Sequence, residues 1–146
     1  MAAPAARREG ANDSLRPIPN DRLEIRADPQ KGRGVFAREP IAAGALIEAA
    51  PVIVVPAGQC ALIDKTVLHD YYFHWDGDPE AGLESDGRGA VALGLVSLCN
   101  HSRRPRARVR RNYARETLDL VALMPIAAGE EVTIDYNCPL WFEAQD

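Results

Sequence analysis

The chain has 146 residues, of which 47% are hydrophobic and 26% charged, and its formal net charge is −4. This length and composition predict one soluble globular domain with a buried core. No apolar run approaches the ~20 residues of a membrane-spanning helix, and the N-terminus lacks the apolar stretch of a secretory signal, so we expect neither a membrane protein nor a secreted one.

Residues 1–19 are rich in small side chains, mixed in charge and interrupted by proline. Such a segment has little apolar surface to bury, and it predicts a flexible N-terminal tail. We therefore place the folded domain at residues 20–146.

Short runs rich in valine, isoleucine and leucine follow the tail. They read GVFA, ALIEAAPVIVVP, RARVRR, TLDLVAL and EVTIDY, with glycine and proline between them, and they predict β-strands. Residues 59–73 carry apolar side chains near helical spacing and predict one helix, whereas the stretch DGDPEAGLESDGRG after it predicts a loop. The expected fold is mainly β with a small helical insert.

The pentapeptide PIAAG occurs twice, from Pro40 to Gly44 and from Pro125 to Gly129, 85 residues apart. We call these segments the first and second PIAAG turns. Proline fixes φ at the start of each turn, and glycine tolerates positive φ at its end. Two copies are too few for a solenoid, so they predict two similar β-turn-β units that pack together.

Cysteine and histidine spacing gives no sign of a metal site. Cys60, Cys99 and Cys138 are odd in number and lack CxxC spacing, which argues against a disulfide framework and against a zinc ribbon. His69 and His74 stand five residues apart, the wrong step for a metal pair on one helix face. We expect no structural metal and a reducing, cytoplasmic location.

Positive charge is concentrated in one run. The sequence RRPRARVRR, from Arg103 to Arg111, holds six arginines, and subtracting their six charges from −4 leaves −10 for the rest of the chain. Arginine alternates with alanine and valine here, which predicts a strand with one basic and one apolar face. Such a face is usually solvated; as a functional site it would bind an acidic partner such as nucleic acid or a nucleic-acid-bearing particle.

Three further motifs follow one another along the chain. They are KGRGVFA before the first PIAAG turn, NHS at Asn100, and the phrase IAAGEEVTIDY that ends at Tyr136. In this order they resemble the SET domain of protein-lysine methyltransferases, over residues 22–142. The chain looks most like the smallest stand-alone SET proteins, of bacterial and viral type.

The resemblance implies a SET-domain fold, which is β-clip-like, with a C-terminal segment that passes through a loop as a pseudoknot. It also implies S-adenosylmethionine as the cofactor and a lysine side chain of a protein as the methyl acceptor. The small relatives form dimers, so the resemblance implies a homodimer as well.

The GRG sequence is the first candidate cofactor site. Alone it is weak evidence for a nucleotide, because the third glycine and the following helix of a dinucleotide site are missing. The resemblance implies that the backbone of Gly32, Arg33, Gly34 and Val35 holds the methionine end of the cofactor.

The NHS motif is the second candidate cofactor site. An Asn-His pair at a strand end is usually a turn, but the resemblance implies that the Asn100 side chain contacts the amino acid end of the cofactor. The backbone of His101 would meet the adenine edge. The chain departs from the family just afterwards, because arginines replace the usual small residue and the usual asparagine after the proline.

Tyr136 is the candidate catalytic residue. A tyrosine after a β-run is often a packed residue with one hydrogen bond. The resemblance places it beside the transferring methyl group, and it implies that Tyr71 and Trp141 line the substrate channel with it. No cysteine-rich segment follows, so Trp141 or Phe142 would close the cofactor site by stacking.

Two other functions remain open. A catalytically silent SET-like module would bind an acidic partner through the arginine run. A different β-clip protein would share only the PIAAG turns and would not bind S-adenosylmethionine.

Overall fold

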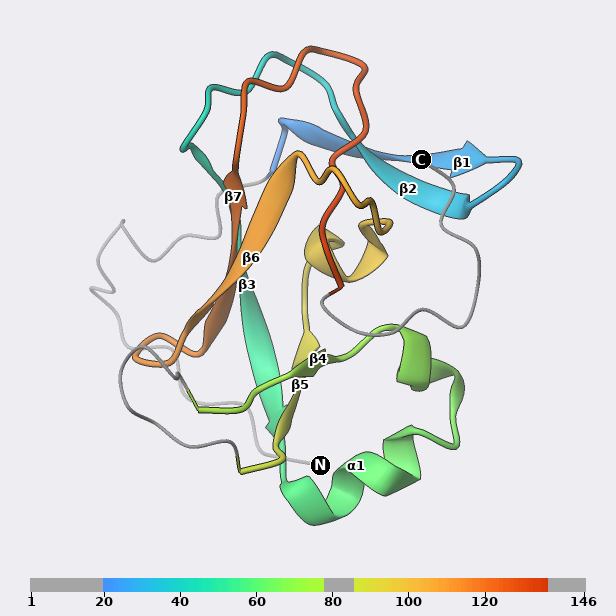
Figure 1. Cartoon of the computed structure of the whole chain (residues 1–146), viewed down its shortest axis with the longest axis vertical. Coiled ribbons are helices and arrows are strands. Elements are labelled where there is room, and N and C mark those ends of the chain that lie inside the picture. Colours follow the sequence, from blue (N-terminus) through green and yellow to red (C-terminus); the bar gives the residue numbers. More distant parts are fainter. Residues whose placement is uncertain (1–19, 78–85, 137–146) are drawn as a thin grey trace, which may run out of the picture.

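The computed structural model describes residues 20–77 and 86–136, so the predicted tail lies outside the described residues. Two antiparallel sheets make up most of the fold (Figure 1). A hairpin pairs β1 (Leu23–Asp28) with β2 (Gly32–Ala37). The larger sheet has the order β4 (Phe73–His74), β5 (Gly89–Ala92), β3 (Leu46–Val55), β7 (Thr117–Ala122) and β6 (Ala107–Asn112).

The mainly β prediction is confirmed, with differences in detail. β2, β3, β6 and β7 form where apolar runs predict strands. β1 and β5 were not predicted, because only one residue of β1 is buried and β5 consists of glycine, alanine and one valine. The predicted strand EVTIDY forms only isolated bridges, at Glu131 and Ile134, because it pairs with two different segments in turn.

The predicted single helix is two short ones, α1 (Ala57–Ile63) and the 3₁₀ helix η2 (Val67–Asp70). A turn separates them, and Thr66 Oγ1 accepts a hydrogen bond from Leu68 N at 3.2 Å to start η2. Neither helix contains a buried residue, so the apolar spacing there does not mark a core face. No helix in residues 20–77 and 86–136 has the length and apolarity to cross a membrane.

The two PIAAG turns pack against each other, as their repetition predicts. Ile41 and Ile126 exchange backbone hydrogen bonds of 2.8 and 2.9 Å, although they are 85 positions apart. Both side chains are buried. In Figure 1 the two turns are the teal and orange-red loops that lie together at the top of the molecule.

The contacts around the turns repeat with two-fold symmetry. Gly44 N donates to Ala122 O at 2.8 Å, and Gly129 N donates to Ala37 O at 2.7 Å. Gly44 and Gly129 have φ of +78° and +86°, the left-handed region that glycine adopts without strain. Each turn therefore closes on the strand that leads into the other one.

The core lies between the two sheets and the turns. Its largest fully buried side chains are those of Trp75, Leu118, Leu120, Ile126, Ile134, Val35, Val96 and Val132. Trp75 contacts the Tyr113 ring at a centroid distance of 4.9 Å. Arg111 Nε donates a hydrogen bond to His74 O, which connects the two edge strands of the larger sheet, β6 and β4. The sheet therefore curls around this core.

Candidate functional site

The segment 131–136 leaves the second PIAAG turn and enters the centre of the molecule, beside the 3₁₀ helix η3 (Leu95–Leu98) (Figure 1). Ile134 N donates to Asn100 O and Ser102 N donates to Ile134 O, both at 3.0 Å. On its other side, Thr133 O accepts from Ala107 N at 3.0 Å. These bonds hold Tyr136 next to the NHS motif, while the predicted pseudoknot stays a prediction.

Tyr136 is held by one hydrogen bond from its side chain and one from its backbone. Its hydroxyl donates to the carbonyl oxygen of Cys99 at 2.8 Å, and its backbone N–H donates to His101 Nδ1 at 3.1 Å. The centroids of the His101 and Tyr136 rings lie 5.2 Å apart. His101 Nδ1 is the acceptor of the backbone bond. The buried His101 side chain therefore helps to fix the position of Tyr136.

Asn100 joins the NHS motif to the GRG strand. Its Nδ2 atom donates to Arg33 O at 3.1 Å and to Glu131 Oε1 at 2.7 Å. Both neighbours are acceptors only, so they determine which end of the amide is NH₂. The carbonyl atom Oδ1 is thereby left for a ligand that donates hydrogen bonds.

The glycines of GRG serve two different purposes. Gly32 has φ of +82°, which turns the chain out of the β1–β2 loop. A Cβ atom at Gly34 would come within 2.7 Å of Glu131 Oε1 and 3.0 Å of Asn100 Nδ2. Gly34 is therefore required for the close approach of β2 to the Asn100 side chain.

A cleft of about 1220 Å³ runs past these groups. Five predicted site residues line it: Gly32, Arg33, Tyr71, Asn100 and Tyr136. Gly34, Val35 and His101 are not in its lining, and Val35 is fully buried. Trp141 and Phe142 lie outside the described residues. The GRG strand, the NHS motif and the closing phrase thus meet at one cleft.

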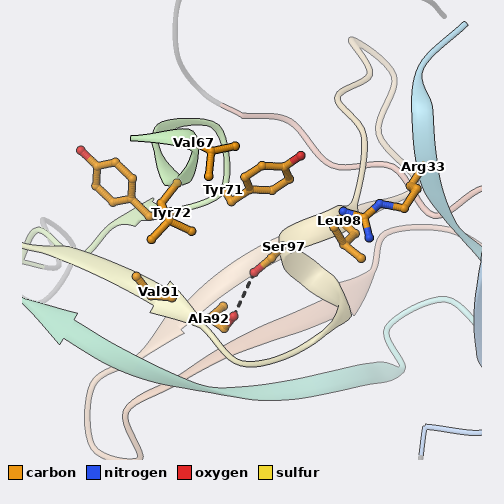
Figure 2. A pocket seen from close by; sticks show the side chains of 9 residues that line it. Arg33, Val67, Tyr71, Tyr72, Val91, Ala92, Ser97 and Leu98 are labelled. Atoms are coloured by element: carbon orange, nitrogen blue, oxygen red, sulfur yellow. Dashed lines mark hydrogen bonds between the residues drawn. The ribbon is translucent and has the colours of Figure 1, made fainter. Parts of the chain in front are cut away.

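A side hollow of about 370 Å³ shares five lining residues with the cleft: Arg33, Tyr71, Tyr72, Ser97 and Leu98. Figure 2 shows Tyr71 beside Val67 above η3, with Arg33 reaching toward Leu98 from β2. Tyr71 ends η2 and is 37% exposed. The helical insert therefore supplies one aromatic wall of the cleft.

Three side chains that line the cleft have perturbed pKa values: Cys99, Asp64 and Tyr72. Burial, with a smaller effect of nearby glutamate charge, raises the pKa of the Cys99 thiol, so this cysteine stays neutral and is no nucleophile. The Tyr72 hydroxyl donates to Asp64 Oδ1 at 2.6 Å; this bond lowers the pKa of Asp64 and raises the pKa of Tyr72 to about 12. His69 Nδ1 also contacts Asp64, at 3.1 Å.

Two glutamates were missed by the sequence analysis. Glu48 of β3 accepts hydrogen bonds from Leu95 N at 3.0 Å and Val96 N at 2.9 Å, and so anchors the start of η3, the helix that precedes Asn100. Glu131 contacts Asn100 and also pairs with Lys31 Nζ at 3.4 Å. The available signal for Glu131 was its place in the closing phrase; for Glu48 there was none.

The arginine run forms the predicted two-faced strand. Ala107 is fully buried and Val109 packs on the core, while Arg108 and Arg110 are exposed. Part of the charge is neutralised internally, because Arg106 Nη2 lies 3.1 Å from a Glu130 oxygen. Arg110 also pairs with an aspartate, and Arg111 donates to a backbone carbonyl. Three of the six arginines thus have partners within the fold, and Arg103, Arg104 and Arg108 are exposed.

Within the described residues, no three histidine, cysteine or acidic side chains gather as a metal site. Cys60 and Cys99 are free thiols, and Cys138 lies outside the described part.

Comparisons with known proteins agree with this architecture. The family profile described as SET domain matches residues 32–137. Over 128 residues the chain is 36% identical to the Schizosaccharomyces pombe protein named histone-lysine N-methyltransferase, H3 lysine-37 specific, spanning 87% of this chain and 81% of that relative.

A solved structure shares the fold. It is a crystal structure of a Plasmodium falciparum protein provisionally named a histone methyltransferase, with a TM-score of 0.58 and 23% identity. The superposition covers 83% of this chain and 97% of the other. The profile match, which spans most of the sequence, and the similarity to the Schizosaccharomyces pombe protein show that the chain belongs to the SET-domain family.

Proposed function

We propose that this chain transfers a methyl group from S-adenosylmethionine to a lysine side chain of a protein. The observation that carries the proposal is the Tyr136 hydroxyl, which donates a hydrogen bond of 2.8 Å to the carbonyl oxygen of Cys99. Tyr136 lines the same cleft as Asn100 and the first two residues of GRG. The family membership and the name of the yeast relative support the same reaction.

The residues of the cleft fit the proposed cofactor. Gly34 leaves room where β2 approaches Asn100, and the free Oδ1 of Asn100 is an acceptor suited to an ammonium group. When bound, S-adenosylmethionine supplies a methyl group already activated by a sulfonium. We assign Gly32, Arg33, Gly34, Val35, Asn100, His101 and Trp141 to holding it.

The protein's own contribution is alignment. The Tyr136 hydroxyl donates a hydrogen bond to Cys99 O at 2.8 Å, and a phenol oxygen held in this way can contact a polarised methyl group through weak CH···O interactions. Placing an acceptor amine in line with a donor can lower a barrier by ~7–11 kcal/mol. Tyr71 and Tyr136 give the channel apolar walls, which favour the neutral amine of a lysine whose ordinary pKa is about 10.4. No acid–base triad is needed.

The test is transfer of labelled methyl groups from S-adenosylmethionine to protein substrates. Histone H3 is the first substrate to try, because the yeast relative is named for it. We expect incorporation at lysine with the wild-type protein and nearly none with Tyr136→Phe. Binding of S-adenosylmethionine without incorporation into any protein of a lysate would favour the silent module instead.

The silent module is the weaker alternative, because its arginine run is partly used inside the fold through Arg106, Arg110 and Arg111. If the run did contact phosphates, partner affinity would fall steeply with added salt. A homodimer and a cytoplasmic location remain parts of this proposal.

A further inference from the structure

We propose that Glu131 is a positioning residue, which orients the Asn100 amide so that its Oδ1 atom meets the ammonium group of the cofactor. This inference rests on the proposed function. Its physical basis is the 2.7 Å contact between Glu131 Oε1 and Asn100 Nδ2.

The first step concerns the two ends of the Asn100 amide. An asparagine amide can rotate by half a turn and present NH₂ or oxygen to a ligand. Here Nδ2 has two partners, Arg33 O at 3.1 Å and Glu131 Oε1 at 2.7 Å. A carbonyl and a carboxylate only accept hydrogen bonds, so the rotated amide would place its oxygen against two acceptors. The observed orientation is therefore strongly preferred.

The second step concerns the charge of Glu131. Its side chain is 12% exposed, and its other oxygen lies 3.4 Å from Lys31 Nζ, whose side chain is 18% exposed. Both carboxylate oxygens therefore have a partner, and a hydrogen bond to a carboxylate is stronger than one between neutral groups. Lys31, Glu131 and Asn100 thus form a connected series at the edge of the cleft.

The adjacent glutamate provides a matched control. Glu130 Oε1 accepts from Ala127 N at 2.8 Å, and its other oxygen pairs with Arg106 at 3.1 Å. It therefore stabilises the second PIAAG turn; neither glutamate lines the cleft, but only Glu131 is hydrogen-bonded to Asn100 among the described contacts. Substitution of Glu130 changes the same charge one residue away from the proposed contact.

The experiment is a double-mutant cycle on cofactor affinity. The dissociation constant of S-adenosylmethionine is measured by calorimetry for the wild type, Asn100→Ala, Glu131→Ala and the double variant. Removing a charged hydrogen-bond partner should weaken binding about tenfold or more in Glu131→Ala. In the Asn100→Ala background the same substitution should change affinity less than about twofold, since Glu131 acts through Asn100.

Two controls make the outcomes decisive. Glu130→Ala should leave the affinity within about twofold of the wild type, because its partners are in the turn. Glu131→Gln keeps an oxygen acceptor and should bind with intermediate affinity; it takes the place of Glu131→Ala in the cycle if that variant does not fold.

Additive losses in the double variant, or wild-type affinity in Glu131→Ala, would overturn the inference while leaving the proposed function intact. A wild-type protein that does not bind S-adenosylmethionine at all would instead end the proposed function.

Discussion

The two PIAAG turns have the same sequence and the same local structure, yet only the second leads into the candidate site. The first turn is followed by Leu46, which pairs with Val121, and the second by Glu131, which pairs with Phe36. These two pairings are equivalent, since both partners are shifted by 85 positions. The symmetry therefore extends to the second residue beyond each glycine.

Beyond these residues, the segments that follow the two PIAAG turns adopt different structures. The first continues as the ten-residue strand β3 in the middle of the larger sheet. The second makes single bridges and ends at Tyr136 against Cys99. A repeated turn thus gives a rigid frame, and the different continuations divide the work between core and site.

The largest effect should come from the buried contact between the turns. Ile41→Ala and Ile126→Ala each remove a side chain that is at most 2% exposed, and each should lower the free energy of unfolding by about 2–5 kcal/mol. Urea unfolding followed by circular dichroism measures this. Similar losses would support an equivalent packing role; a loss at only one isoleucine would break the symmetry.

The next largest effect should be a loss of catalysis, and only for a substitution in the segment that follows the second PIAAG turn. Tyr136→Phe removes the hydroxyl that bonds to Cys99, and the methyl-transfer rate should fall about 100-fold, the scale of a lost preorganised polar contact. Pro51, the symmetry counterpart, is an exposed residue of β3. Pro51→Ala should keep the rate within about twofold, and equal losses in single-turnover assays would contradict the division of roles.

A smaller effect is expected at the turn glycines. Gly44 and Gly129 have positive φ, but an added Cβ atom meets nothing within 4 Å at either position. Replacement by alanine should therefore cost only the backbone strain, about 1–2 kcal/mol of unfolding free energy at each site. Thermal unfolding of the two alanine variants measures this loss of stability. Gly34→Ala is the contrast, because its Cβ would clash with Glu131 and should weaken cofactor binding.

The smallest effect concerns the helical insert between the turns, which has no buried helical residue. Its Tyr72–Asp64 hydrogen bond raises the pKa of Tyr72 to about 12. Because this folded-state pKa exceeds the ordinary value of about 10, the bond stabilises the protein below pH 10 and this contribution is lost as the pH rises through 12.

An alkaline titration followed by phenolate absorbance measures the Tyr72 transition. Asp64→Asn should move it back toward about 10, the value of a free phenol. An unchanged transition would show that Asp64 does not set the pKa of Tyr72.

The sequence predicted the parts of the fold that depend on local patterns. The apolar runs of β2, β3, β6 and β7 and the positive φ of Gly44 and Gly129 follow from composition and turn chemistry. The family resemblance selected Asn100 and Tyr136, which line the same cleft. Alternation also predicted the basic and apolar faces of β6.

What could not be predicted depends on contacts between distant residues. Glu131 and Asn100 are 31 positions apart, and no periodicity connects them. Residues 131–136 have the composition of a strand, but tertiary contacts divide their hydrogen bonds between two neighbours, so no ladder forms. The helical insert was predicted as one helix because apolar spacing does not reveal the turn that separates α1 from η2.

The mutual closure of the two turns has a consequence for biosynthesis. Ile41 finds its backbone partner only when Ile126 has left the ribosome, so the first half of the protein must wait with an unpaired loop. Contacts of such long sequence separation slow folding. The nascent chain should therefore be a target for chaperones until its second half emerges, and cofactor capture should be among the last events of maturation.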